Sequence, residues 1–147
     1  MTCAASDHWP LKDGLRIGHL NINHLINKMS GAPHIVHNSK LYGRGFHIFC
    51  FSESRLNNHM DDKENAIEGF HVIRKDPQNQ KEPGLVVYVH ETMCVTRLTE
   101  FEKYGVECIW LEVKLQKKSP VLVGFLYRSP FAGGGCMRDV EQGRHLL

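Results

Sequence analysis

Apolar segments of strand length recur along the chain, separated by turn-forming residues. Six of them are rich in Val, Ile, Phe and Tyr and are bounded by Gly, Pro, Asn or Asp: residues 15–22, 46–52, 70–74, 84–90, 106–115 and 120–128. This pattern is typical of β-strands. The runs 46–51 and 85–89 are almost continuously apolar, which predicts strands covered on both faces. In 106–115 apolar and polar residues alternate, which predicts a half-exposed strand.

Segments with helical character are few. We expect a helix over residues 25–42, interrupted at Ser30-Gly31-Ala32-Pro33 so that a new helix begins near Pro33, and short helical pieces near 61–67 and 98–104. These helices could cover one face of a six-stranded sheet but hardly both. The pattern therefore predicts an α/β (α+β) fold that lacks a covering layer, and self-association through the uncovered sheet face.

The composition bounds the class of protein. A chain of 147 residues with 41% hydrophobic and 23% charged residues has the size and composition of one globular domain. Its formal net charge of +2 is too small to indicate a nucleic-acid partner by itself. Five cysteines without a Cys-x-x-Cys pair argue against a disulfide framework and a zinc ribbon, which indicates an intracellular setting, nuclear or cytoplasmic. No stretch approaches the roughly 18 apolar residues of a membrane span, so we expect no membrane partner.

Three polar residues stand where apolar segments end. Asn21, Glu53 and Tyr127 each close or follow a predicted strand and lie far apart in the sequence. Alone, Asn21 is consistent with a strand-ending turn and Tyr127 with a tyrosine at the edge of the core. A carboxylate that a buried strand delivers to the rim of a sheet is a suitable hard ligand for Mg²⁺. Because polar groups from several strand ends that meet at one rim form a site, we predict a site here.

Several short motifs follow one another in order along the same segments. They are Leu20-Asn21-Ile22-Asn23, Phe51-Ser52-Glu53-Ser54-Arg55-Leu56, the strand 84–89, Glu107-Cys108-Ile109-Trp110-Leu111-Glu112 and Tyr127-Arg128-Ser129-Pro130. As an ordered set they resemble the first half of an endonuclease/exonuclease/phosphatase domain, most closely the endonuclease of LINE-type (non-LTR) retrotransposons, over residues 15–130. Residues 1–14 would then be an N-terminal extension and residues 131–147 an unrelated tail.

The resemblance implies a fold, an activity and roles for individual residues. The fold is a β-sandwich flanked by helices, of which this chain supplies about one sheet and its covering helix. The activity is Mg²⁺-dependent hydrolysis of phosphodiester bonds in DNA by an activated water. Glu53 matches the metal-binding glutamate, Asn21 the active-site asparagine near the metal and phosphate, and Tyr127 the tyrosine that contacts the scissile phosphate. Arg55 and Arg128 lie near the nucleic-acid-facing rim.

The sequence also departs from the family pattern. His24 stands where the family often has glycine. The Gly-Asp-x-Asn turn, a second aspartate and the C-terminal Ser-Asp-His have no counterpart, and these supply the base that activates water and the histidine at the phosphate. Ser6-Asp7-His8 spells the last motif at the wrong end of the chain. The pair His34 and His37 lies on one helical face without a third ligand, so we interpret it as helix surface.

We therefore expect a truncated, retrotransposon-derived endonuclease-like domain that is inactive alone, because each positioned acid–base group contributes about 10²–10⁴ in rate. Two alternatives remain open. One is a non-catalytic module that binds nucleic acid or another partner. The other is a phosphatase-type member of the same superfamily, which the ending Tyr127-Arg128-Ser129-Pro130 makes less suitable.

Overall fold

The computed structural model of the chain describes residues 14–37, 45–79, 82–103 and 106–129. Within them the strands form a four-stranded sheet, called sheet A here, and a three-stranded sheet, called sheet B. Sheet A has the order β1 (Ile17–Asn21), β2 (Ile48–Ser52), β4 (Leu85–His90), β3 (Phe70–Lys75). Sheet B has the order β5 (Cys94–Arg97), β6 (Glu107–Lys114), β7 (Val121–Tyr127). The helical elements are α1 (Ala32–His37) and the 3-10 helices η1 (Ile26–Lys28), η2 (Asp62–Asn65) and η3 (Thr99–Phe101).

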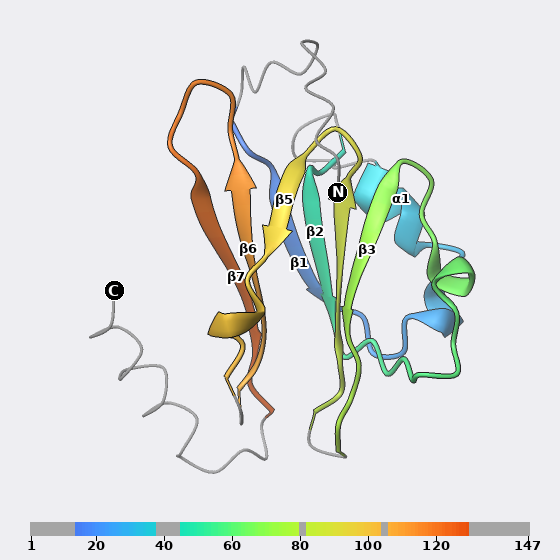
Figure 1. Ribbon diagram of the computed structural model, residues 1–147. Helices are drawn as coiled ribbons and strands as arrows, with labels where there is room; N and C mark the ends of the chain where they lie inside the picture. The colour runs from blue at the N-terminus through green and yellow to red at the C-terminus, as the bar shows by residue number, and fades with distance from the viewer. Residues whose placement is uncertain (1–13, 38–44, 80–81, 104–105, 130–147) are drawn as a thin grey trace.

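The elements form three layers, with sheet A between sheet B and α1 (Figure 1). Alternate residues of β2 and β4 point to opposite faces of sheet A. One set packs against sheet B in a core formed by Ile48, Cys50, Leu85, Val87 and Val89 with Met93, Val95, Ile109, Leu111, Val113 and Phe125. The other set packs beneath the helical layer in a second core, which includes Phe49, Phe51, Val86 and Tyr88 with Leu25, Val36, Leu56 and Ile67. The continuous apolar runs are therefore explained, because β2 and β4 are covered on both faces.

The α+β fold class is confirmed, and every predicted strand segment contains a strand. The expectation that the chain supplies about one sheet is wrong, because β6 pairs with both β5 and β7, and these three strands form a sheet of their own. The sequence reading missed β5. This strand has only four residues, of which Thr96 and Arg97 are polar, so it lacks the apolar run from which strands are predicted.

The helical predictions agree with the structure where it describes them. Both η1 and α1 lie within residues 25–42, and α1 begins at Ala32, directly before the predicted start at Pro33. The short helices η2 and η3 fall within 61–67 and 98–104. None of the helices in the described part of the chain combines the length and the apolar composition that crossing a bilayer requires.

Some sequence predictions concern cysteines and chain ends. Cys50 and Cys108 are free and buried, whereas Cys94 is disulfide-bonded, so the expectation against disulfides does not hold at Cys94. The predicted extension, apart from Gly14, and the predicted tail lie outside the described residues, as does Ser6-Asp7-His8.

The exposed apolar side chains concentrate on one side of the sandwich. Five of the six large hydrophobic side chains that are exposed in the described residues belong to β1 or β7: Ile17, Leu20, Val121, Leu122 and Leu126. These strands are the edges of their sheets, and the rings of His19 and Phe125 lie 6.1 Å apart between them. Neither strand contains Lys, Arg, Asp or Glu. We call the surface formed by these two strands the open side.

The opposite side of the sandwich is built differently. Its edge strands are β3 and β5, which carry Arg74, Lys75 and Arg97. Arg97 Nη1 donates a hydrogen bond to the Arg74 carbonyl at 2.9 Å, which ties the two edges together. Charged residues on edge strands discourage pairing with other chains. Among the edge strands in the described part of the chain, those of the open side therefore lack this protection.

We expect the chain to self-associate through the open side rather than through a face of sheet A, since both faces of sheet A are covered. Leu122→Lys places a charge on an uncharged edge, and we expect it to raise the dissociation constant of the self-associated form at least about tenfold. Sedimentation velocity over a concentration series measures this. Phe101→Lys is the matched control, because Phe101 is the one exposed large hydrophobic of this set that lies off the open side. Equal effects of the two changes would contradict the prediction.

Candidate functional site

The predicted site residues meet because of how the strands pair. β1 and β2 are parallel neighbours, and Asn21 lies opposite Ser52, so Asn21 and Glu53 lie at the same end of these two strands. β7 of sheet B ends beside them with Tyr127. The Tyr127 hydroxyl donates a hydrogen bond to Glu53 Oε1 and thereby joins the two sheets. The structure thus brings together the three residues that sequence reasoning selected.

The surroundings of Glu53 favour its ionised form. The hydrogen bond from Tyr127 lowers the pKa of the Glu53 carboxyl, burial opposes this, and a hydrogen bond from Asn21 and the nearby Arg55 lower it further. Arg55 Nη2 lies 3.6 Å from Glu53 Oε2. Burial and the hydrogen bond to Glu53 together raise the pKa of Tyr127 to about 12. At neutral pH the pair is therefore a carboxylate and a neutral phenol that donates to it.

The loops that carry these residues hold unusual backbone conformations. Asn23, His24, Glu53 and Arg55 have φ angles of 44°, 69°, 53° and 52°. Positive φ is uncommon for residues other than glycine and costs free energy, and such residues cluster at functional sites. His24 has the largest of these angles, and its backbone adopts the left-handed conformation that glycine favours.

Hydrogen bonds between the two loops maintain these conformations. The His24 and Leu25 N–H groups donate to the carbonyls of Glu53 and Ser54 at 2.9 and 3.0 Å. Arg55 Nε donates to Asn23 Oδ1 at 3.2 Å. The loop after β1 and the loop after β2 therefore form one unit, and a change in either loop should displace Glu53.

A second carboxylate, which sequence reasoning missed, lies next to this cluster. Glu107 is opposite Tyr127 in the β6–β7 ladder and is only 5% exposed. Burial raises the pKa of Glu107 to about 7, although a hydrogen bond from the Gly84 backbone opposes the rise. The signal was present in the alternation of β6, since Glu107 shares the phase of the apolar residues Ile109 and Leu111. A carboxylate on a buried apolar face is costly and needs a reason.

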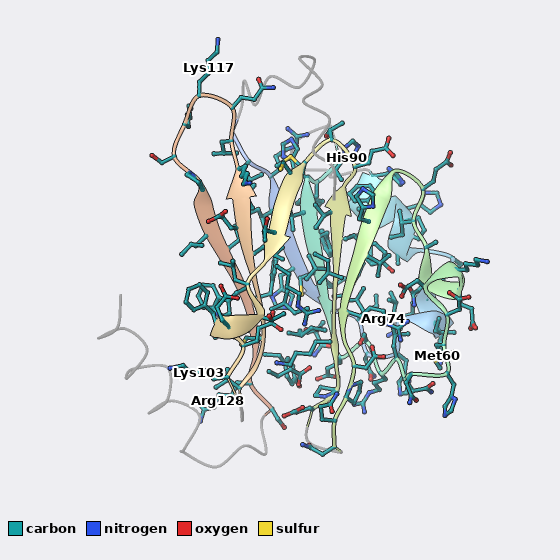
Figure 2. All side chains as sticks on the ribbon, in the orientation of Figure 1. Met60, Arg74, His90, Lys103, Lys117 and Arg128 are labelled. Atoms are coloured by element: carbon teal, nitrogen blue, oxygen red, sulfur yellow. The ribbon has the colours of Figure 1, made fainter. Side chains whose placement is uncertain are left out.

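Arg55 and Arg128 differ in whether they contact the cluster. The Arg55 side chain is 42% exposed and belongs to the cluster through its contacts with Glu53 and Asn23. Arg128 is exposed and follows Tyr127 at the end of β7 (Figure 2), but no hydrogen bond or ion pair within the described residues joins it to the cluster. His37 is exposed on α1 and packs its ring against Phe70 at 5.3 Å.

The donor set at Glu53 can be compared with the needs of Mg²⁺. Within the described ranges, no three side chains of His, Cys, Asp or Glu gather where they could hold a metal ion. Mg²⁺ sites commonly use one or two carboxylates, with water and substrate phosphate completing the octahedron. The ionised Glu53 carboxylate with the neighbouring Asn21 amide fits such a site when a phosphate is present.

The cluster combines a carboxylate, an amide, a phenol and a partly exposed guanidinium at the rim between two sheets. These groups can bind a divalent cation and a phosphate together. Comparison of the chain with models of known protein families and with curated proteins finds no match.

Proposed function

We propose that residues 15–129 are the cation- and phosphate-binding half of an endonuclease-like domain, similar to that of LINE-type retrotransposons, whose reaction is Mg²⁺-dependent hydrolysis of DNA. The observation that carries the proposal is the hydrogen-bonded cluster of Asn21, Glu53 and Tyr127. These residues come from two sheets and are distant in sequence. Core packing alone does not require three polar groups to converge at one rim.

Each residue has a role that follows from its environment. Glu53, held ionised by its neighbours, would hold Mg²⁺, and Asn21 would orient the carboxylate. The bound ion supplies a Lewis acid for a phosphoryl oxygen. Tyr127 keeps its proton at neutral pH, and its hydroxyl, which donates to Glu53 here, would turn to donate to the phosphate once the carboxylate holds the ion. The exposed guanidinium of Arg55 would neutralise phosphate charge.

The proposal includes weak or absent hydrolysis by these 147 residues alone. The sequence contains no counterpart of the Gly-Asp-x-Asn turn, the second aspartate or the C-terminal Ser-Asp-His. Those groups would provide the base and the phosphate-contacting histidine, and each such group is worth about 10²–10⁴ in rate. We expect no nicking of supercoiled DNA with Mg²⁺ or Mn²⁺ above a Glu53→Ala control. Nicking that disappears in Glu53→Ala would contradict this expectation.

The binding part of the proposal has its own test. Phosphate contacts release counterions, so DNA affinity should fall as salt rises, with a slope on logarithmic axes of about 0.9 per phosphate contacted. We expect Arg55→Ala to weaken binding and to reduce the slope by about one contact. Fluorescence anisotropy of a labelled duplex measures both. Lys117→Ala is the matched control, because Lys117 lies at the far end of the molecule from Arg128 and the β7 terminus (Figure 2).

A second candidate function is a module that binds nucleic acid and never hydrolyses it. The partial exposure of Arg55 at a rim of neutral and acidic groups favours it. Both candidates require binding that weakens with salt. Binding that does not depend on salt, or on Arg55, would remove both.

A further inference from the structure

The loop that carries Glu53 is fixed from behind by a neighbouring segment. The Ser54 N–H donates to the Gly84 carbonyl at 3.2 Å, and the Arg55 N–H donates to the Pro83 carbonyl at 2.8 Å. These bonds lie between the positive φ angles of Glu53 and Arg55 and hold the backbone that follows Glu53. The position of Glu53 therefore depends on where residues 83–84 lie.

Gly84 fits closely against this loop. Its φ is +95°, and a Cβ added to it would lie 2.5 Å from Ser54 Oγ and 3.0 Å from Pro77 Cδ. A side chain would therefore push the segment away from Ser54. The close approach makes residues 83–84 an effective support for the Glu53 loop, provided that Gly84 is itself held in place.

Glu107 is the group that holds it. The Gly84 N–H donates a hydrogen bond to the Glu107 carboxyl across the space between the sheets. Glu107 also faces Tyr127, the donor to Glu53, from the opposite position on the ladder. Glu107 thus contacts Gly84, which supports the Glu53 loop. It also neighbours Tyr127, which donates a hydrogen bond to the Glu53 side chain.

Packing does not account for this carboxyl. An apolar residue at position 107 would continue the buried face of β6. The carboxyl is instead buried with one oxygen, Oε1, that has no hydrogen-bond partner among the described residues, as is also true of Ser54 Oγ. Leaving buried polar atoms unpaired costs free energy, and such groups call for a functional explanation.

We propose that Glu107 is a positioning residue for Glu53: through Gly84 it fixes the loop that carries Glu53, and across the β6–β7 ladder it orients Tyr127. The inference rests on the proposed function in treating Glu53 as the cation-holding residue. Glu107 itself contacts neither cation nor phosphate in this role. Its loss should loosen the site without unfolding the sandwich, because a well-packed apolar residue can replace a buried charge.

The test compares amide hydrogen exchange in the complete chain and its variants. In Glu107→Leu the Gly84 N–H loses its acceptor, and we expect the Ser54 and Arg55 amides to exchange at least about tenfold faster. Glu107→Gln retains an oxygen acceptor and should restore slow exchange. Glu112→Leu, on the other face of the same strand, is the control. Unchanged protection of the Val87 amide would show that the fold is intact, and unchanged exchange at Ser54 and Arg55 in Glu107→Leu would overturn the inference.

Mn²⁺ binding, measured by water proton relaxation, separates this inference from the proposed function. Loss of a residue that orients a metal ligand typically weakens metal binding about 10–100-fold, which is the loss we expect for Glu107→Leu. Glu53→Gln should remove binding at this site. If Glu53→Gln has no effect, the proposed function fails, and the exchange result still decides the role of Glu107. If only Glu53→Gln has an effect, the function stands and the positioning role is wrong.

Discussion

Glu107→Gln is expected to raise the free energy of unfolding relative to the unmodified protein as the pH rises. The difference between the two proteins should be about 3 kcal/mol more favourable to the variant at about pH 8 than at about pH 4.5. Burial raises the pKa of Glu107 from 4.5 to about 7 on folding. Between these two values the folded chain binds a proton that the unfolded chain does not. The stability associated with this group is therefore complete below about pH 4.5 and is lost as the pH rises through about 7. Glutamine cannot ionise, so the variant does not suffer this loss.

The comparison must be made between variant and unmodified chain at each pH, because other groups titrate in the same range. Burial lowers the pKa of His47 from 6.5 to about 4, which makes the fold more stable as the pH rises through that window. This effect has the opposite sign and is present in both proteins, so it cancels in the difference. Urea unfolding at several pH values measures the difference. A constant difference across the range would contradict the raised pKa of Glu107.

The sequence predicts strands well where burial leaves a local signature. Residues 46–51 and 85–89 are apolar without interruption because β2 and β4 lie between two layers, and this pattern can be read directly. The convergence of Asn21 and Glu53 follows from the strand ends, since Asn21 closes β1, Glu53 follows the buried strand β2, and the two strands are parallel neighbours. Tyr127 also ends a predicted strand, although its strand belongs to the other sheet.

The division into two sheets has no such signature. The chain leaves sheet A at His90 and enters sheet B at Cys94, with only three residues between the strands. Nothing in so short a connection distinguishes a hairpin within one sheet from a step into the next. Strand pairing is set by contacts distant in sequence, and β5 is too short and polar to show a pattern of its own.

Glu107 was missed for a different reason. The alternation of residues 106–115 was predicted, but Glu107 was not assigned to either face of the strand. The structure places it on the buried face, opposite Tyr127. A polar residue in the apolar phase of an amphipathic strand breaks the local rule, and such breaks tend to mark functional positions.

A chimera that joins residues 1–130 to the C-terminal half of a LINE-type endonuclease is expected to nick supercoiled DNA in a Mg²⁺-dependent way. The first half already holds Asn21, Glu53 and Tyr127 in one cluster. Its open side presents two uncharged strand edges, β1 and β7, at which added strands of each sheet could pair. The added half would supply the absent acid–base groups, each worth about 10²–10⁴ in rate.

The variants of this chimera decide between two views of the first half. If its cluster is sound, Glu53→Ala should remove most of the nicking, since water cannot replace a positioned carboxylate in holding the ion. Lys117→Ala, at the far end of the molecule, should leave nicking unchanged. A chimera that melts cooperatively yet does not nick would mean that this half has drifted from a working geometry despite its hydrogen bonds. Nicking that survives Glu53→Ala would instead show that the cation is held elsewhere, because no other carboxylate of the cluster is ionised and exposed enough to take its place.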